Sequence, residues 1–180
     1  GQRMGMPFEG YLVNIPEEEY KQAFADKLPE KITGRAYLDL YGRHIDHITT
    51  IDPNKEYAVK AAASHPVFEH NRVKQFIELL ESLPGADSQN RLRILKAMGG
   101  LMYAAHDGYI SCGLNSKGTD MLVALSKDYA HSGVFGAKIT GGGSGGTVCF
   151  LAYGTEGLES VYQIHTAYEQ LSGKKVVFFE

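Results

Sequence analysis

The alternation of apolar and polar positions predicts long helices over much of the chain and strands mainly in its last third. Beginning at Pro66, apolar residues recur at helical spacing while charged residues take the opposite face. Similar stripes predict helices from about Ser88 to Tyr109, before Gly133 and before Gly173. The four stripes are Val73, Phe76, Ile77 and Leu80; Leu95, Met98, Met102, Ala105 and Tyr109; Leu122, Val123, Leu125 and Tyr129; and Leu158, Val161, His165, Tyr168 and Leu171.

Two shorter helices are expected in the first third of the chain. Asn14 is suited to cap a helix that has Pro16 and three glutamates in its first turn and ends near Lys27 or Leu28. Thr33 is suited to cap a second helix that runs through Tyr41 and stops at Gly42.

Short β-branched and aromatic runs predict four strands. A small, mainly antiparallel sheet with helices on one face follows, so we expect an α+β fold. No repeat or linker divides the sequence, so we expect one domain over residues 1–180. The predicted strands are Tyr57–Lys60, Ala137–Thr140, Thr147–Tyr153 and Val176–Phe179.

A glycine-rich stretch separates the two central strands and is the first candidate for chemistry. Five of the six positions from Gly141 to Gly146 are glycine, which permits positive φ and close approach to backbone N–H groups. A dinucleotide-binding loop would open a helix, whereas a strand follows here. A phosphate-binding Walker loop would need Lys after Gly146, where Thr147 stands. Two interpretations stay open: a turn that merely needs glycine, or a loop that another group approaches closely.

Glycine also interrupts the predicted helix from Ser88 to Tyr109. Gly99 and Gly100 each cost about 1 kcal/mol relative to alanine in a helix. Close helix packing or approach to a ligand would each account for them.

Composition narrows the function. The 180 residues carry 18 basic and 21 acidic side chains, interspersed along the chain, so we expect no nucleic-acid partner. No apolar run approaches the roughly 20 residues that span a bilayer, so we expect no membrane partner. Two cysteines form no disulfide framework, and a cytoplasmic location is expected.

Among polar side chains, no complete active site is recognisable. His44, Asp46 and His47 form the tightest histidine cluster, but no second cluster with ligand spacing supports a metal site, and we expect none. His106 and Asp107 could orient a substrate hydroxyl, although adjacent residues on a helix do not face each other. Both remain possible substrate-side residues.

Residues 136–146, GAKITGGGSGG, are similar to the third motif of the GHMP small-molecule kinases, which is a strand, a glycine loop and a strand near the C-terminus. The stretches "HPVFEHNRVKQF" and "MGGLMYAAHDGYISCGLNSKGTDMLV" resemble the C-terminal helices of galactokinases. The chain as a whole resembles the L-arabinokinase branch most, through "GYLVNIP", "DKLPEKITGRAYLDLYG" and "IDPNKEYAVKAAASHP".

The chain departs from the family pattern at two places. Thr147 stands where galactokinases usually have cysteine. The second family motif, P-x-x-x-G-L-S-S-S, is absent, and residues 113–116 (GLNS) resemble only a small part of it. The family's catalytic aspartate, its arginine partner and its sugar-binding motif have no counterpart here, so we expect no catalytic residue in this chain. The start at Gly1 fits a domain taken from a longer protein.

The resemblance implies a ferredoxin-like C-terminal domain of a sugar 1-kinase of galactose or L-arabinose type. The full-length enzyme would use ATP and Mg²⁺, with neither bound by this chain alone, and its partners would be an N-terminal kinase domain and a monosaccharide. The residues expected to support the phosphate loop are Thr140, Gly141, Gly142, Gly143, Ser144, Gly145 and Gly146. The alternative is a free-standing regulatory module whose glycine turn holds an anion or a nucleotide.

Overall fold

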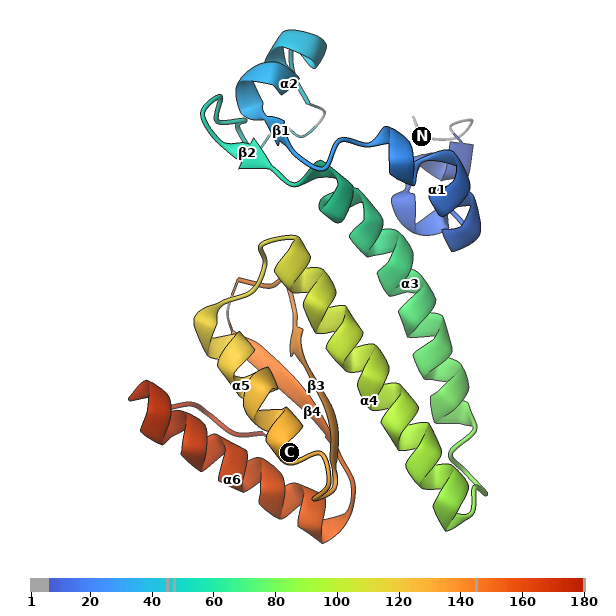
Figure 1. Cartoon of the computed structure of the whole chain (residues 1–180), viewed down its shortest axis with the longest axis vertical. Coiled ribbons are helices and arrows are strands. Elements are labelled where there is room, and N and C mark those ends of the chain that lie inside the picture. Colours follow the sequence, from blue (N-terminus) through green and yellow to red (C-terminus); the bar gives the residue numbers. More distant parts are fainter. Residues whose placement is uncertain (1–6, 45, 47, 145, 180) are drawn as a thin grey trace. The chain divides into compact units, whose positions relative to one another are not determined.

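The computed structural model describes residues 7–44, 46, 48–144 and 146–179 (Figure 1). The chain divides into two compact units, residues 1–71 and residues 72–180. Helix α3 (Val59–Glu81) contributes to both units. The expectation of one domain over the whole chain therefore stays a prediction.

The first unit is built around a small helix, α1 (Glu17–Ala23). Its Tyr20 is 1% exposed, bonds to the Ser64 hydroxyl over 2.8 Å and packs edge-on against Phe68, whose ring centroid lies 5.8 Å away. The N-cap is Pro16 and not the predicted Asn14, whose amide donates to the Phe8 carbonyl instead. The unit also contains short 3₁₀ turns η1 (Pro7–Gly10), η2 (Leu12–Asn14) and η3 (Ala25–Lys27).

The second predicted short helix is confirmed as α2 (Gly34–Tyr41). The Thr33 side chain accepts from the Ala36 N–H, and Gly42 ends the helix at a φ of 71°. Beside it, β1 (Ile32–Thr33) pairs antiparallel with β2 (Glu56–Tyr57). The strand predicted from Tyr57 to Lys60 is therefore wrong beyond its first residue.

Helix α3 begins at Val59, so the prediction that Pro66 opens this helix is wrong. Proline within a helix removes one backbone hydrogen bond and costs about 3 kcal/mol. The helix is held on both sides of Pro66 by the contacts of Ser64 and Phe68 with Tyr20, which local propensity does not reveal. On the later turns, the predicted apolar face is half exposed at Val73, Ile77 and Leu80.

Besides the end of α3, the described residues of the second unit form a β-hairpin and three helices, as predicted from the sequence. Strand β3 (Val134–Thr140) pairs antiparallel with β4 (Thr147–Ala152), with a register shift between Val134 and Gly136. The helices are α4 (Ser88–Ser111), α5 (Lys117–Asp128) and α6 (Gly154–Ser172), the last ended by Gly173 at a φ of 68°. The predicted α+β class is confirmed, with two small antiparallel sheets, and the arrangement is consistent with a ferredoxin-like domain.

The core of this unit lies between the hairpin and helices α5 and α6 (Figure 1). Val134, Val161 and Ile164 form its buried centre. Helix α5 starts with a capping box, in which Ser116 and Thr119 bond to each other's backbone N–H. Residues packed around the centre are Leu122, Leu125, Tyr129, Phe150, Ala152 and Phe178.

Two glycines allow α4 to touch β3 at the level of the backbone. A Cβ on Gly99 would overlap the carbonyl oxygen of Phe135, and one on Gly136 would lie 2.5 Å from the Gly99 Cα. Close packing therefore accounts for Gly99. A Cβ on Gly100 would meet nothing within 4 Å, so packing does not account for it.

The last segment of the chain is not a strand, and the prediction of one from Val176 to Phe179 is wrong. The segment runs back along α6 (Figure 1). The Val176 N–H donates to Glu169 over 3.1 Å, and the Phe178 ring stacks on Tyr162 with centroids 4.5 Å apart. These contacts hold the segment on the helix, away from any strand partner among the described residues.

Candidate functional site

The glycine stretch is a turn between two antiparallel strands, as predicted. Strand β3 ends at Thr140 and β4 begins at Thr147. Positive φ occurs at Gly141 (80°), Gly143 (86°) and Gly146 (127°), and also at Ser144 (61°). These dihedrals disfavour residues with a Cβ, so the backbone alone requires three of the glycines. Gly145 lies outside the described residues.

The glycines of the turn differ in what surrounds them. A Cβ on Gly143 would lie 2.8 Å from the Leu114 Cβ, so this position is crowded as well as left-handed. A Cβ on Gly141 or Gly146 would meet nothing within 4 Å. Gly142 has the same open space, and its φ lies outside the left-handed range. Neither the backbone nor the packing of the described residues therefore requires glycine at position 142.

The turn rests on the end of α4 and on the residues that follow this helix. The Tyr109 hydroxyl donates to the Gly141 carbonyl over 3.0 Å, and the Ser144 N–H donates to the Leu114 carbonyl. The Leu114 N–H in turn bonds to the Tyr109 carbonyl over 2.9 Å. One side of the turn is fixed by these contacts, while Thr140, Gly141 and Gly142 stay exposed.

A buried histidine of α4, His106, lies close to β3, one turn of helix before Tyr109. His106 is 2% exposed, and its Nδ1 accepts the Ile139 N–H over 3.4 Å. Because Nδ1 accepts, the proton of the neutral ring sits on Nε2. Nε2 lies 3.2 Å from Oδ1 of Asp120, without the alignment of a regular hydrogen bond. The other oxygen of Asp120 accepts from Asn115 over 2.6 Å. The polar cluster His106, Asp120 and Asn115 thus links α4, β3 and the start of α5.

The structure does not bring His106 and Asp107 together. Asp107 is exposed, and its carbonyl accepts the Ser111 hydroxyl. The carboxylate beside His106 is Asp120, 14 positions further along the chain, which the sequence analysis missed. Asp120 lies in the first turn of α5, where an acidic residue indicates the start of a helix. That signal does not indicate that Asp120 lies beside His106. A substrate-side role for His106 or Asp107 stays a prediction.

The histidine cluster near residue 46 forms a local turn. The His44 ring bonds to the Thr49 carbonyl over 2.8 Å, and Asp46 accepts from the Ile48 N–H and the Thr49 hydroxyl. The Thr49 hydroxyl is the main cause that lowers the pKa of Asp46. His47 lies outside the described residues. Within the part of the chain that the structure describes, no three His, Cys, Asp or Glu side chains gather as metal ligands.

Cys149 is a thiol without the surroundings of a nucleophile. It lies on β4, and its Sγ contacts the Lys138 carbonyl at 3.5 Å. Burial raises the pKa of this thiol, so the neutral form is favoured.

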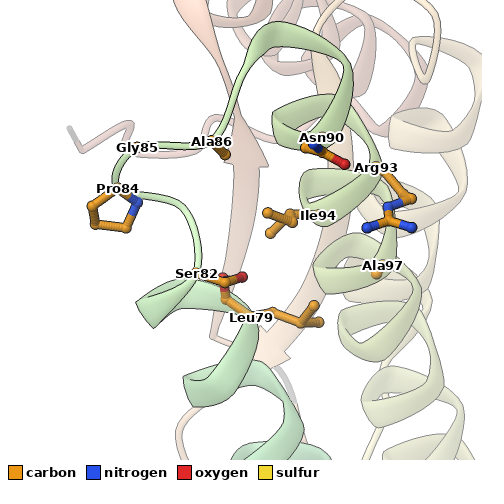
Figure 2. Close-up of a pocket in the computed structure, with 9 residues that line it drawn as sticks. All are labelled: Leu79, Ser82, Pro84, Gly85, Ala86, Asn90, Arg93, Ile94 and Ala97. Carbon is orange, nitrogen blue, oxygen red and sulfur yellow. The ribbon is translucent and has the colours of Figure 1, made fainter.

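Among the described residues of the second unit, two cavities were compared with the predicted site. One, of about 610 Å³, lies between the end of α3 and the start of α4, where Leu79 and Ile94 point into it beside Arg93 (Figure 2). It contains no predicted site residue. The other, of about 820 Å³, borders the glycine turn at Gly146 and follows β4.

Comparison with known proteins gives one informative match. No family model matches this chain. The chain is 39% identical to an L-arabinokinase of Arabidopsis thaliana over 178 residues, which cover 94% of this chain. The chain spans only 17% of the length of that relative. Nearly all of this sequence is thus similar to one part of a much longer L-arabinokinase.

The helices of the described residues were also searched for membrane spans. None of them combines the length and the apolar composition that a membrane-spanning helix needs.

Proposed function

We propose that this chain is the C-terminal part of an ATP-dependent sugar 1-kinase, and that its glycine turn supports the ATP phosphate site where another domain approaches. The match to an L-arabinokinase supports this proposal and favours L-arabinose over galactose as the sugar. The partners would be an N-terminal kinase domain and a monosaccharide.

The observation that carries the proposal is the surroundings of Gly142. This residue has an ordinary φ, is exposed and has open space where a side chain would stand. A turn that only reversed the chain would tolerate alanine there. Glycine at this position is expected if a group outside this chain approaches the backbone closely.

The contribution of this chain to the reaction would be positional. Phosphoryl transfer depends mainly on alignment and on charge stabilisation, which ATP-bound Mg²⁺ and the residues around it supply. Tyr109 and Leu114 hold the turn from one side, so its exposed backbone would meet the phosphate-binding loop of the other domain without reorganising. The described residues offer no set of three metal ligands, so we assign Mg²⁺ to no residue of this chain.

The test is ATP-dependent formation of sugar 1-phosphate by the full-length protein that contains this chain and by the 180-residue chain alone. The full-length protein is expected to phosphorylate L-arabinose more efficiently than D-galactose. The 180-residue chain is expected to fold, as seen by circular dichroism, and to form no product. Product formation by the chain alone, or no activity of the full-length protein on either sugar, would contradict the proposal.

The regulatory-module alternative predicts a different result. Calorimetric titration of the 180-residue chain with ATP or inorganic phosphate would then show binding, and the full-length protein would lack sugar kinase activity. For the kinase proposal we expect no measurable binding by the chain alone, because the phosphate loop is absent from it.

A further inference from the structure

The outer edge of β4 carries backbone groups without a strand partner. Within the described residues, β4 pairs only with β3, and Ile139 stands opposite Val148. The Ile139 N–H donates to His106, so it points away from β4. In an antiparallel pair of this kind, the N–H and C=O groups of both opposed residues point away from the partner strand. The N–H and C=O of Val148 therefore point out of the hairpin.

The same alternation gives the direction of the backbone N–H and C=O groups at the neighbouring residues of β4. Phe150 stands opposite Ala137, two positions from the first pair, so its N–H and C=O also point outward. Cys149, opposite Lys138, is of the other type and bonds to β3. The open edge thus presents two donors and two acceptors, on Val148 and Phe150.

The cavity of about 820 Å³ lies along this edge. It is lined by every residue from Gly146 to Phe150 and by every residue from Val176 to Phe179. Side chains of a strand alternate between the two faces, so a cavity on one face would be lined by alternate residues. Consecutive residues from both segments mean that the cavity lies between their edges.

The far wall of the cavity is itself extended. Val177 and Phe179 are 76% and 74% exposed, whereas Val176 and Phe178 are partly buried, which is the alternation of a strand. Ala152 at the end of β4 and four residues of helices α5 and α6 supply the remaining lining. These helix residues are Leu122, Leu158, Val161 and His165, and the His165 Nε2 already bonds to the Val176 carbonyl over 3.2 Å.

We propose that this cavity is an open strand position, filled by an extended segment of the longer protein that lies outside this chain. The segment would bond to the N–H and C=O groups of Val148 and Phe150. Since the lining is mostly apolar and contains no Asp, Glu, Lys or Arg, the inward side chains of the segment would be apolar, β-branched or aromatic, at every second position. This inference rests on the proposed function, because it takes the chain to be one part of a longer kinase.

A strand fits the cavity better than a small apolar ligand does. The volume is within the range of about 300–1,000 Å³ that small-molecule pockets have. An apolar ligand, however, would bury the four outward backbone groups of Val148 and Phe150 without partners, at about 1–3 kcal/mol each. A peptide strand satisfies all four.

Amide hydrogen exchange, read by mass spectrometry with residue-level fragmentation, tests the proposal on the 180-residue chain and on the full-length protein. In the chain alone, the Val148 and Phe150 amides are expected to exchange rapidly while the Cys149 amide is protected. In the full-length protein, both edge amides are expected to exchange more than about a hundredfold more slowly. Unchanged exchange there would overturn the proposal.

Two variants separate strand pairing from side-chain packing. Val148→Pro removes the outward N–H and is tolerated at a strand edge, so β3 pairing should survive in the chain alone. In the full-length protein, this variant is expected to abolish the protection of Phe150. Val148→Ala keeps the N–H and should retain that protection. Cys149→Pro removes a donor that faces β3 and should lose the hairpin in both proteins.

Two other occupants of the cavity would give distinct exchange results, and either result would overturn the proposal. Protection of Val148 and Phe150 in the monomeric chain would mean that its own Val176–Phe179 segment pairs with β4. Protection that appears only as the chain concentration rises would mean a second copy. Loss of sugar kinase activity with the edge protection intact would remove the proposed function but leave the added strand standing.

Discussion

Gly99 and Gly136 face each other across the contact between α4 and β3, with no side chain between their backbones. The adjacent glycine of α4, Gly100, is exposed and has open space around it. Packing therefore requires glycine at position 99 but not at position 100, although the two glycines are adjacent in the sequence.

Alanine at these two positions should change stability in opposite directions. Gly99→Ala would force a Cβ into the Phe135 carbonyl and is expected to destabilise the chain by about 1–3 kcal/mol or more. Gly100→Ala is expected to stabilise it by about 0.5–1 kcal/mol through helix propensity. Urea unfolding followed by circular dichroism measures both. Equal effects would contradict the packing seen at Gly99.

Gly142 and Gly143 separate the fold from the proposed function. Gly143→Ala meets both a positive φ and Leu114, so it is expected to lower the melting temperature. Gly142→Ala should leave the melting temperature of the 180-residue chain almost unchanged, yet reduce kcat in the full-length enzyme at least about tenfold, because a misplaced contact can cost that much. Thermal unfolding and sugar 1-phosphate formation are measured on both variants. Full turnover of Gly142→Ala would show that no group approaches this part of the turn.

The buried contact of His106 with Asp120 should be visible in stability. Asp120→Ala removes the carboxylate 3.2 Å from the buried His106 Nε2 and the acceptor of the Asn115 amide, and it is expected to cost about 1–3 kcal/mol. Asp107→Ala, beside His106 in sequence but exposed, should change stability by less than about 0.5 kcal/mol. Adding His106→Leu to Asp120→Ala should recover part of the loss, since removing both partners is less costly than removing one. Strict additivity in urea unfolding would argue against the pairing.

The attachment of the C-terminal segment should depend on pH through Glu169. The Lys175 ammonium, 2.6 Å away, and then the Val176 N–H lower the pKa of this carboxyl. With the pKa lower in the folded protein, the stabilisation is complete above the ordinary glutamate value of about 4.3. It is lost as the pH falls through the lowered value in the folded protein. NMR signals of Phe178 should therefore shift toward those of an unstructured segment on acidification, and Glu169→Gln should remove this dependence.

Local sequence determined the elements whose ends depend only on neighbouring residues. Thr33 and Gly42 bound α2, Gly173 ends α6, and the glycine run turns the chain between β3 and β4, all as predicted. A capping hydroxyl or a positive φ acts within a few residues, so its signal is present in the sequence itself.

Tertiary structure decided the features that depend on contacts between distant segments. Pro66 lies inside α3 because Tyr20 packs against the turns around it. His106 pairs with Asp120 and not with Asp107, because adjacent residues on a helix point to different faces. The segment Val176–Phe179 has the composition of a strand, but its extended backbone binds α6 and leaves the edge of β4 open. Strand pairing needs a partner at hydrogen-bonding distance, and no pattern within one segment can supply that partner.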